Sequence, residues 1–181
     1  GNRYVFNVSG GTVTAATTAA SKSYGDAAIS LSGQISYTLT GPAFGGGNSY
    51  GVYASNESND SMSTIPSIAS SGNTLAAGVG TYAYTFATLG VASGGFSYTS
   101  LNNGSFTVAP KTVTYVGSTT NVTYNASPQS ANNTYHLTGV ISSDLSNVSL
   151  SAFTAASGTD AGTYLDTVTN LSGTASGNYQ L

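Results

Sequence analysis

The chain contains the stretch VGTYAYTF at residues 79–86 and repeats it in altered form as AGTYLDTV at residues 161–168. A glycine followed by alternating β-branched and aromatic residues is typical of a strand that begins after a tight turn. An internal repeat indicates that a chain is built from copies of one structural unit. We therefore expect the chain to contain two copies of one unit, each with this strand.

Shorter matches surround both copies in the same order. They pair YGD at 24–26 with YNA at 124–126, LTG at 39–41 with LTG at 137–139, and GGFSY at 94–98 with SGNY at 176–179. This order predicts an all-β fold made of two tandem antiparallel β-sandwich modules of the immunoglobulin-like kind. We expect the first module at residues 15–110 and the second at residues 111–181, with Pro110 at the boundary.

The composition excludes several classes of protein. Charged residues make up 5% of the 181 residues, against roughly 25% in an ordinary soluble domain. The basic side chains are Arg3, Lys22 and Lys111, too few to bind nucleic acid by releasing counterions. No apolar run is long enough to span a membrane, and no signal peptide is recognisable. The thirteen Tyr and six Phe residues favour a folded chain over a disordered one.

Alternating patterns place the expected strands. In the first module, Ile29, Leu31, Ile35, Tyr37 and Leu39 are expected to face a core. An insertion at residues 42–76, absent from the second module, contains a short strand around Tyr50 and Tyr53. Further strands are expected at 81–88, 96–101, 105–109, 111–116, 121–124, 134–137, 148–153 and 163–168.

The two ends of the sequence do not match. The second module lacks the last strand that the first has at residues 105–109, and residues 1–14 are an orphan strand segment. Because an open sheet edge exposes unpaired main-chain groups, one interpretation is that residues 4–14 of one copy complete the second module of another. The donor side chains are then Tyr4, Phe6, Val8 and Val13. The other interpretation is that residues 1–181 are cut from a longer array of repeats.

These motifs resemble the MBG and YDG-type modules that occur in tandem in large bacterial surface proteins and adhesins. The residues that carry the resemblance are 24–26, 39–41, 79–82 and 104–110 in the first copy, and 137–139, 160–164 and 176–179 in the second. The second copy departs from the pattern at residues 124–126, where YNA replaces YGD. The resemblance implies an extracellular spacer in a stalk, with no catalytic residues.

No set of residues predicts an active site. His136 is the only histidine, so neither a histidine pair for a metal nor a Ser-His-Asp grouping can be assembled around it. Asp26 and Asp160 lie in turn-like contexts, where a carboxylate caps main-chain N–H groups. A calcium site needs several oxygen ligands, and no Asp-rich loop is present. We expect no enzyme, no metal and no cofactor.

Asparagines and tyrosines provide the remaining candidates. Asn-X-Ser/Thr triplets recur along the chain, and Asn56, Asn59 and Asn103 are the strongest candidates for glycosylation. The expected function is an extracellular structural protein, a subunit of a surface filament or adhesin stalk that assembles head to tail with copies of itself. The alternative is an adhesin segment that binds a glycan through the insertion at 42–76, where Tyr50 and Tyr53 would stack on sugar rings.

Overall fold

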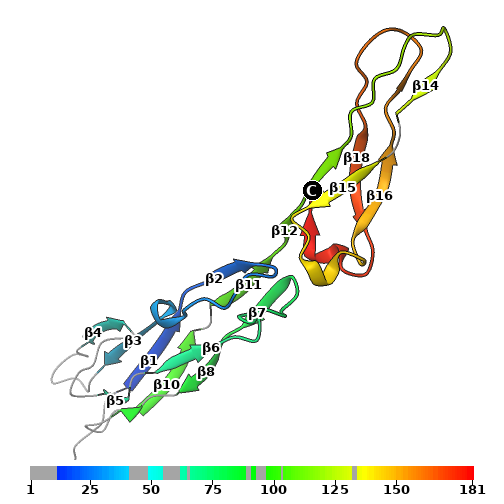
Figure 1. Ribbon diagram of the computed structural model, residues 1–181. Coiled ribbons are helices and arrows are strands. Elements are labelled where there is room, and N and C mark those ends of the chain that lie inside the picture. The colour runs from blue at the N-terminus through cyan, green and yellow to red at the C-terminus, as the bar shows by residue number, and fades with distance from the viewer. Residues whose placement is uncertain are drawn as a thin grey trace, which may run out of the picture. The chain divides into compact units, whose positions relative to one another are not determined.

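The fold is described by a computed structural model covering residues 12–40, 49–54, 62–64, 66–88, 91–92, 97–102, 104–131 and 134–181. These residues form strands joined by loops, with three one-turn 3-10 helices, so the expected all-β class is confirmed (Figure 1). The chain divides into two compact units, unit 1 with Gly1–Lys22 and Asp26–Val108, and unit 2 with Ser23–Gly25 and Ala109–Leu181. No helix of the described residues is long and apolar enough to cross a membrane.

The larger sheet of unit 1 has four strands in the order β10-β1-β3-β4. Their bounds are β1 Thr12–Thr17, β3 Ile35–Thr40, β4 Ser49–Ala54 and β10 Ser97–Asn102. Strand β1 is an interior strand, parallel to β10 on one side and antiparallel to β3 on the other.

This pairing corrects one sequence-based prediction. Val13 was expected to belong to a donor strand, yet it lies in β1 opposite Tyr98 and Leu39 of its own unit. Because both edges of β1 are already occupied, the main chain at Val13 has no edge to offer to another copy. Tyr4, Phe6 and Val8 lie outside the described residues.

A second sheet of unit 1 places β11 between two other strands. The order is β2-β11-β7, with bounds β2 Ala20–Ser23, β7 Gly80–Ala83 and β11 Ser105–Ala109. Two strand pairs complete the unit, β6 (Ser67–Ala69) with β8 (Thr85–Thr88), and β5 (Met62–Thr64) with β9 (Val91–Ala92). The single strand expected at 81–88 is interrupted at Tyr84, whose side chain is buried.

The core of unit 1 is only partly the one expected. Leu31, Ile35 and Tyr37 are buried as predicted, in and just before β3 and the 3-10 turn η1 (Ser32–Gln34). Ile29 is 39% exposed, which corrects the prediction. Its main-chain N–H and C=O both bond to the Asn73 side chain, so Ile29 belongs to a loop and not to a strand.

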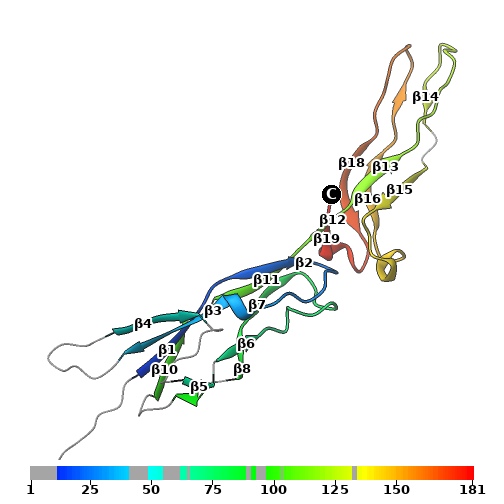
Figure 2. The same cartoon turned by 60° about the vertical axis from the view of Figure 1, so that its left-hand side comes forward.

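The strands in the described part of unit 2 form four pairs, and most of them are labelled in Figure 2. The pairs are β12 (Lys111–Thr112) with β19 (Tyr179–Gln180), β13 (Thr114–Gly117) with β15 (Tyr135–Thr138), β14 (Gln129–Ser130) with β17 (Ser157–Gly158), and β16 (Ser149–Thr154) with β18 (Thr167–Ser172). The β12·β19 pair is parallel and the other three are antiparallel.

The core of unit 2 is centred on Val113, Val148 and Tyr179. Tyr24 packs its ring edge-on against Tyr179, with ring centroids 5.4 Å apart. The Tyr24 and Tyr179 hydroxyls donate hydrogen bonds of 2.9 and 2.8 Å to the same oxygen of Asp144, at the end of the 3-10 turn η2 (Ser142–Asp144). A third 3-10 turn, η3 (Ser176–Asn178), leads into β19. Tyr24 was expected in the first module, but it contributes to the second core.

One strand that the sequence predicts in unit 2 does not form, and another begins later than expected. Residues 121–124 are not in a strand, and the strand expected at 163–168 begins only at Thr167. Strand conformation is held by hydrogen bonds to a neighbouring strand. No strand of the described residues forms a hydrogen-bonded ladder with either segment, which agrees with their irregular conformation.

Candidate functional site

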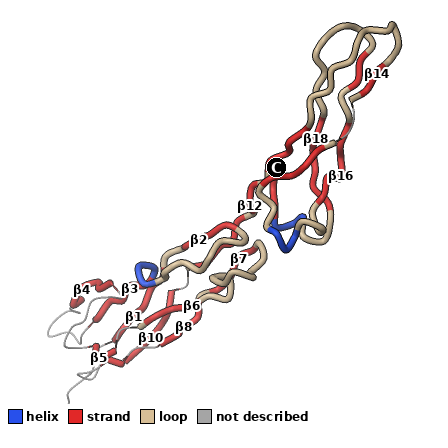
Figure 3. The backbone as a smooth tube through the Cα atoms, viewed as in Figure 1, coloured by secondary structure: helices blue, strands red, loops and turns tan. Residues whose placement is uncertain are grey.

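Unit 2 contains an open cavity of about 660 Å³ among its loops. Its lining comes from three stretches of the chain, residues 117–122 with Tyr124, 129–131 and 156–166, together with Tyr115. Figure 3 shows these stretches mainly as loop, drawn in tan beyond the strands β16 and β18. The site is therefore a groove between loop segments rather than a pocket inside a sheet.

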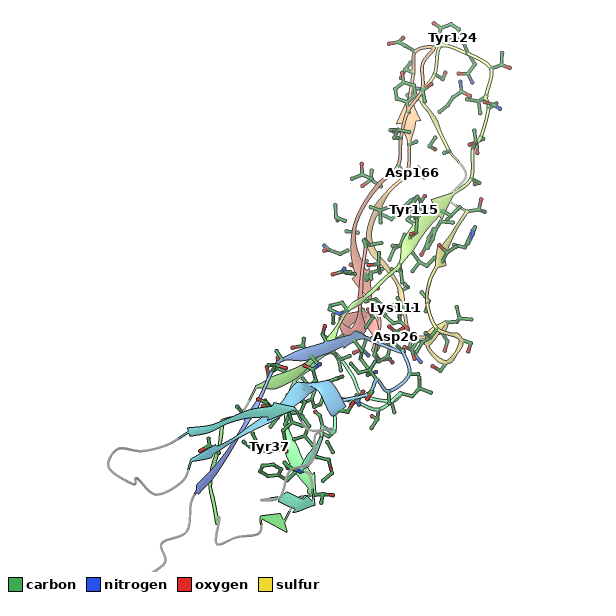
Figure 4. All side chains as sticks on the ribbon, turned by 90° about the vertical axis from the view of Figure 1, so that its left-hand side faces the viewer. Asp26, Tyr37, Lys111, Tyr115, Tyr124 and Asp166 are labelled. Carbon is green, nitrogen blue, oxygen red and sulfur yellow. The ribbon has the colours of Figure 1, made fainter. Side chains whose placement is uncertain are left out.

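One wall of the groove is fixed by a pair of polar residues. The Tyr115 hydroxyl on β13 donates a 2.6 Å hydrogen bond to Asp166, whose other carboxylate oxygen accepts a 2.8 Å bond from the Ala156 N–H. Figure 4 shows Tyr115 and Asp166 close together in unit 2. This pairing holds the loop before β18 against β13.

The pairing also shifts the ionisation of both residues. The hydrogen bond to Asp166, followed by burial, raises the pKa of Tyr115 to about 12. The same bond, followed by the bond from the Ala156 N–H, lowers the pKa of Asp166. At neutral pH, Asp166 is a carboxylate acceptor and Tyr115 a protonated donor, which is the arrangement that the bond requires.

The ring of Tyr115 packs in an aromatic cluster. Its ring centroid lies 5.8 Å from that of Tyr135 and 6.1 Å from that of Phe153, and these two are 5.6 Å apart. Aromatic pairs at such separations add to the energy of burying their area. Packing of these rings holds the strands β13, β15 and β16 together next to the loop segments that line the groove.

Apolar side chains are exposed along the two long segments of the groove. Val122 is 59% and Tyr124 is 60% exposed on one segment, and Tyr164 is 44% and Leu165 is 83% exposed on the other. A single exposed apolar residue is ordinary, whereas several lining one groove mark a surface suited to a partner.

Unit 1 shows the same GTY sequence in a completed sheet. There the segment is β7, and β11 pairs with it antiparallel, with Phe106 opposite Tyr82 and Val108 opposite Gly80. Phe106 and Val108 are fully buried. In unit 2 no described strand pairs with residues 162–165 in a hydrogen-bonded ladder.

The local structure around the two tyrosines is nevertheless alike. The Tyr82 hydroxyl donates to the Gly78 carbonyl, and the Tyr164 hydroxyl donates to the Asp160 carbonyl, four residues back in each case. Each ring lies against a glycine that leaves room for it, Gly72 in unit 1 and Gly158 in unit 2.

The second segment of the groove also has a counterpart in unit 1. Strand β2 lies on the other side of β11, and the Tyr24 N–H just after it donates a 2.9 Å bond to the Ala109 carbonyl. Residues 120–123 precede Tyr124 in the same way without forming a strand, and residues 120–122 of this segment line the groove. Both neighbours of β11 thus have counterparts in unit 2, and these counterparts face one groove.

The other candidates from the sequence belong to unit 1 or lie outside the described residues. Tyr50 and Tyr53 lie in β4, where Tyr53 is opposite Tyr37 of β3. Asn56, Asn59, Asn103 and most of the insertion at 42–76 lie outside the described residues.

The chemistry of the groove is that of a binding surface. His136 lies exposed on β15 and does not line the groove. Asp160 lines it through an exposed loop, and its carbonyl oxygen is held by Tyr164. In the described residues no group of three or more His, Cys, Asp or Glu is placed to hold a metal ion. The groove offers main-chain hydrogen-bonding groups and apolar side chains, which together suit an extended peptide.

Comparisons with known proteins add no family to these observations. No family model, no curated protein and no solved structure matches this chain.

Proposed function

We propose that the chain is a non-enzymatic extracellular structural protein that assembles head to tail into a surface filament or adhesin stalk. In this proposal the two units are copies of one β-sandwich module, and unit 2 is completed by a strand from another copy. Its partners are copies of itself, and its localisation is the cell surface.

The observation that carries the proposal is the difference between the two GTY segments. Residues Gly80–Ala83 form a strand paired with β11, while residues 162–165 have the same GTY sequence and pair with no strand among the described residues. Unpaired main-chain groups beside exposed apolar residues favour the addition of a strand.

A strand donated in this way links copies in one direction. The donor and the groove are different parts of the chain, so each contact is head to tail and does not close on itself unless the rotation between copies forms a ring. Repetition of an open contact gives a filament. The low charge, 5% of residues, supports close packing of copies because few charges are desolvated on assembly.

The matched substitutions Val122→Asp and Leu75→Asp test the proposal. Both residues are exposed, 59% and 64%, but only Val122 lines the groove. The expected result is long uniform filaments from the unaltered chain by negative-stain electron microscopy, retained in Leu75→Asp and lost in Val122→Asp. Monomers in sedimentation velocity at every concentration of the unaltered chain would contradict the proposal.

A further inference from the structure

We infer that the groove of unit 2 binds residues 5–9 of a second copy as a β-strand, in the position and register that β11 has in unit 1. This inference rests on the proposed head-to-tail assembly and names its donor, its acceptor and their alignment. The donor segment precedes the described residues, and the acceptor is described in full.

The sequence of the donor matches that of β11. Residues 6–14 read FNVSGGTVT and residues 106–114 read FTVAPKTVT. Phe6 therefore corresponds to Phe106, and Val8 to Val108. The match continues into the next strand, since both segments lead to TVT, at Thr12 in β1 and at Thr112 in β12. Residues 5–9 thus precede β1 in the sequence as β11 precedes β12.

The ladder between β11 and β7 fixes the expected register. In unit 1, Ser105, Phe106, Thr107 and Val108 lie opposite Ala83, Tyr82, Thr81 and Gly80. Residues 5–8 match residues 105–108, and residues 162–165 match residues 80–83. The expected pairs are therefore Val5 with Leu165, Phe6 with Tyr164, Asn7 with Thr163, and Val8 with Gly162. A shift by one residue would turn Phe6 and Val8 out of the groove, because side chains alternate between the faces of a strand.

The burial of Phe106 and Val108 in unit 1 indicates how deeply Phe6 and Val8 would be buried in the groove. Phe106 is 0% exposed and Val108 is 1% exposed, while Thr107 between them is only partly buried. Phe106 also lies next to Gly72, beside the ring of Tyr82. Phe6 would take the corresponding place beside Tyr164 and Gly158, and Asn7 would point to the opposite face.

The other edge of the donor would meet residues 120–123. In unit 1 the corresponding strand β2 places Lys22 in a buried position, 7% exposed. Val122 stands at the corresponding place and is 59% exposed. By the same correspondence, the Tyr124 N–H would donate to the Ser9 carbonyl, as the Tyr24 N–H donates to the Ala109 carbonyl. Both edges of the donor strand would then be paired.

Disulfide trapping between two full-length chains tests this alignment, since the natural chain has no cysteine. One chain carries Asn7→Cys and the other Thr163→Cys. Cα atoms directly opposite in an antiparallel ladder are about 4.5–5.5 Å apart, within the range that a disulfide spans. The register control replaces Asn7→Cys by Ser9→Cys, which moves the thiol by two positions. A chain with Thr81→Cys and Thr107→Cys, opposite each other in unit 1, is the positive control.

The expected result is that the Asn7→Cys and Thr163→Cys chains form a covalent dimer at least about tenfold faster than the register control. Sedimentation of the unaltered chain is measured in parallel. Multimers without this preferred cross-link would overturn the assigned donor and register while leaving head-to-tail assembly in place. Absence of both multimers and cross-link would overturn the inference and the proposed function together.

A second pair of variants tests the two faces of the donor. Phe6→Asp and Asn7→Asp add the same charge one residue apart. Phe6→Asp is expected to weaken assembly at least about tenfold, because a carboxylate would be buried where Phe106 is buried in unit 1. Asn7→Asp is expected to leave assembly within about threefold of the unaltered chain, because its side chain points out of the groove. Equal effects of the two substitutions would overturn the register.

Discussion

Phe106 on β11 lies directly opposite Tyr82 on β7, and its side chain is fully buried. Tyr164 has the same GTY context and the same hydrogen bond to the carbonyl four residues back, but it is 44% exposed. What distinguishes these two regions is the strand that covers the tyrosine.

Phe106→Ala should destabilise unit 1 strongly. Removing a fully buried phenylalanine ring costs about 3–5 kcal/mol when the surroundings do not collapse into the space. Thr107→Ala, at the next position and only partly buried, should change the free energy of unfolding by no more than about 1 kcal/mol. Urea denaturation of the full chain measures both values. Equal losses would show that β11 is not held by the face that carries Phe106.

Gly72→Ala and Gly158→Ala should differ in their effects. A Cβ at Gly72 would press on both Tyr82 and Phe106, so overpacking should cost about 1–3 kcal/mol. The three atoms nearest to a Cβ at Gly158 all belong to the ring of Tyr164, which is 44% exposed and can move aside. In dilute, unassembled protein Gly158→Ala should therefore change the midpoint of thermal unfolding less than Gly72→Ala. The reverse order would count against the packing described around Tyr82.

Asp166→Asn should make unit 2 less sensitive to acid. The pKa of Asp166 is lowered in the folded chain by the Tyr115 hydroxyl and then by the Ala156 N–H. Stability from this carboxylate is therefore present above the ordinary pKa of 3.8 and is lost as the pH falls through the folded value. The denaturation midpoint should be lower than that of the unaltered chain at pH 7 and close to it at acid pH. Asp160→Asn, an exposed neighbour, should leave the curve unchanged.

Tyr179→Phe should remove part of the alkaline unfolding of unit 2. Burial and the bond to Asp144 raise the pKa of Tyr179 to about 12. Stability from the protonated phenol is present below the ordinary value of 10.0 and is lost as the pH rises towards about 12. The substitution should cost about 1–3 kcal/mol at pH 7, because it removes a bond to a charged group. Its penalty should shrink between pH 10 and 12, while Tyr124→Phe, at an exposed site, should show neither effect.

The sequence pattern correctly predicts several strands that pair with another strand of the chain. It also predicts strands in segments that pair with none, and these segments do not adopt strand conformation. The strand at 105–109 is observed as predicted, and those at 134–137 and 148–153 are observed one residue later. Residues 121–124 and 163–166 have the pattern of strands but not their conformation. The alternation of apolar and polar residues indicates which side chains a strand would bury. It does not indicate whether a neighbouring strand is present to form the hydrogen bonds that a strand requires.

Two features of unit 2 carry no local signal in the sequence. Asp144 accepts bonds from Tyr24 and Tyr179, which lie far from it along the chain. Asp166 stands in the repeat where the first copy has Tyr84, and its partner Tyr115 comes from a strand about fifty residues earlier. The replacement of a buried tyrosine by an aspartate in an otherwise matching strand was the signal that could have pointed to the second pair.

Hydrogen exchange of the main-chain amides in residues 162–165 tests the central claim most directly, because a strand added to this edge would protect them. Exchange is compared between the assembled chain and the Phe6→Asp variant at the same concentration. The account predicts slow exchange in the assembly and fast exchange in the variant, with β16 and β18 unchanged in both. Equally fast exchange at 162–165 in filaments and in the variant would contradict it.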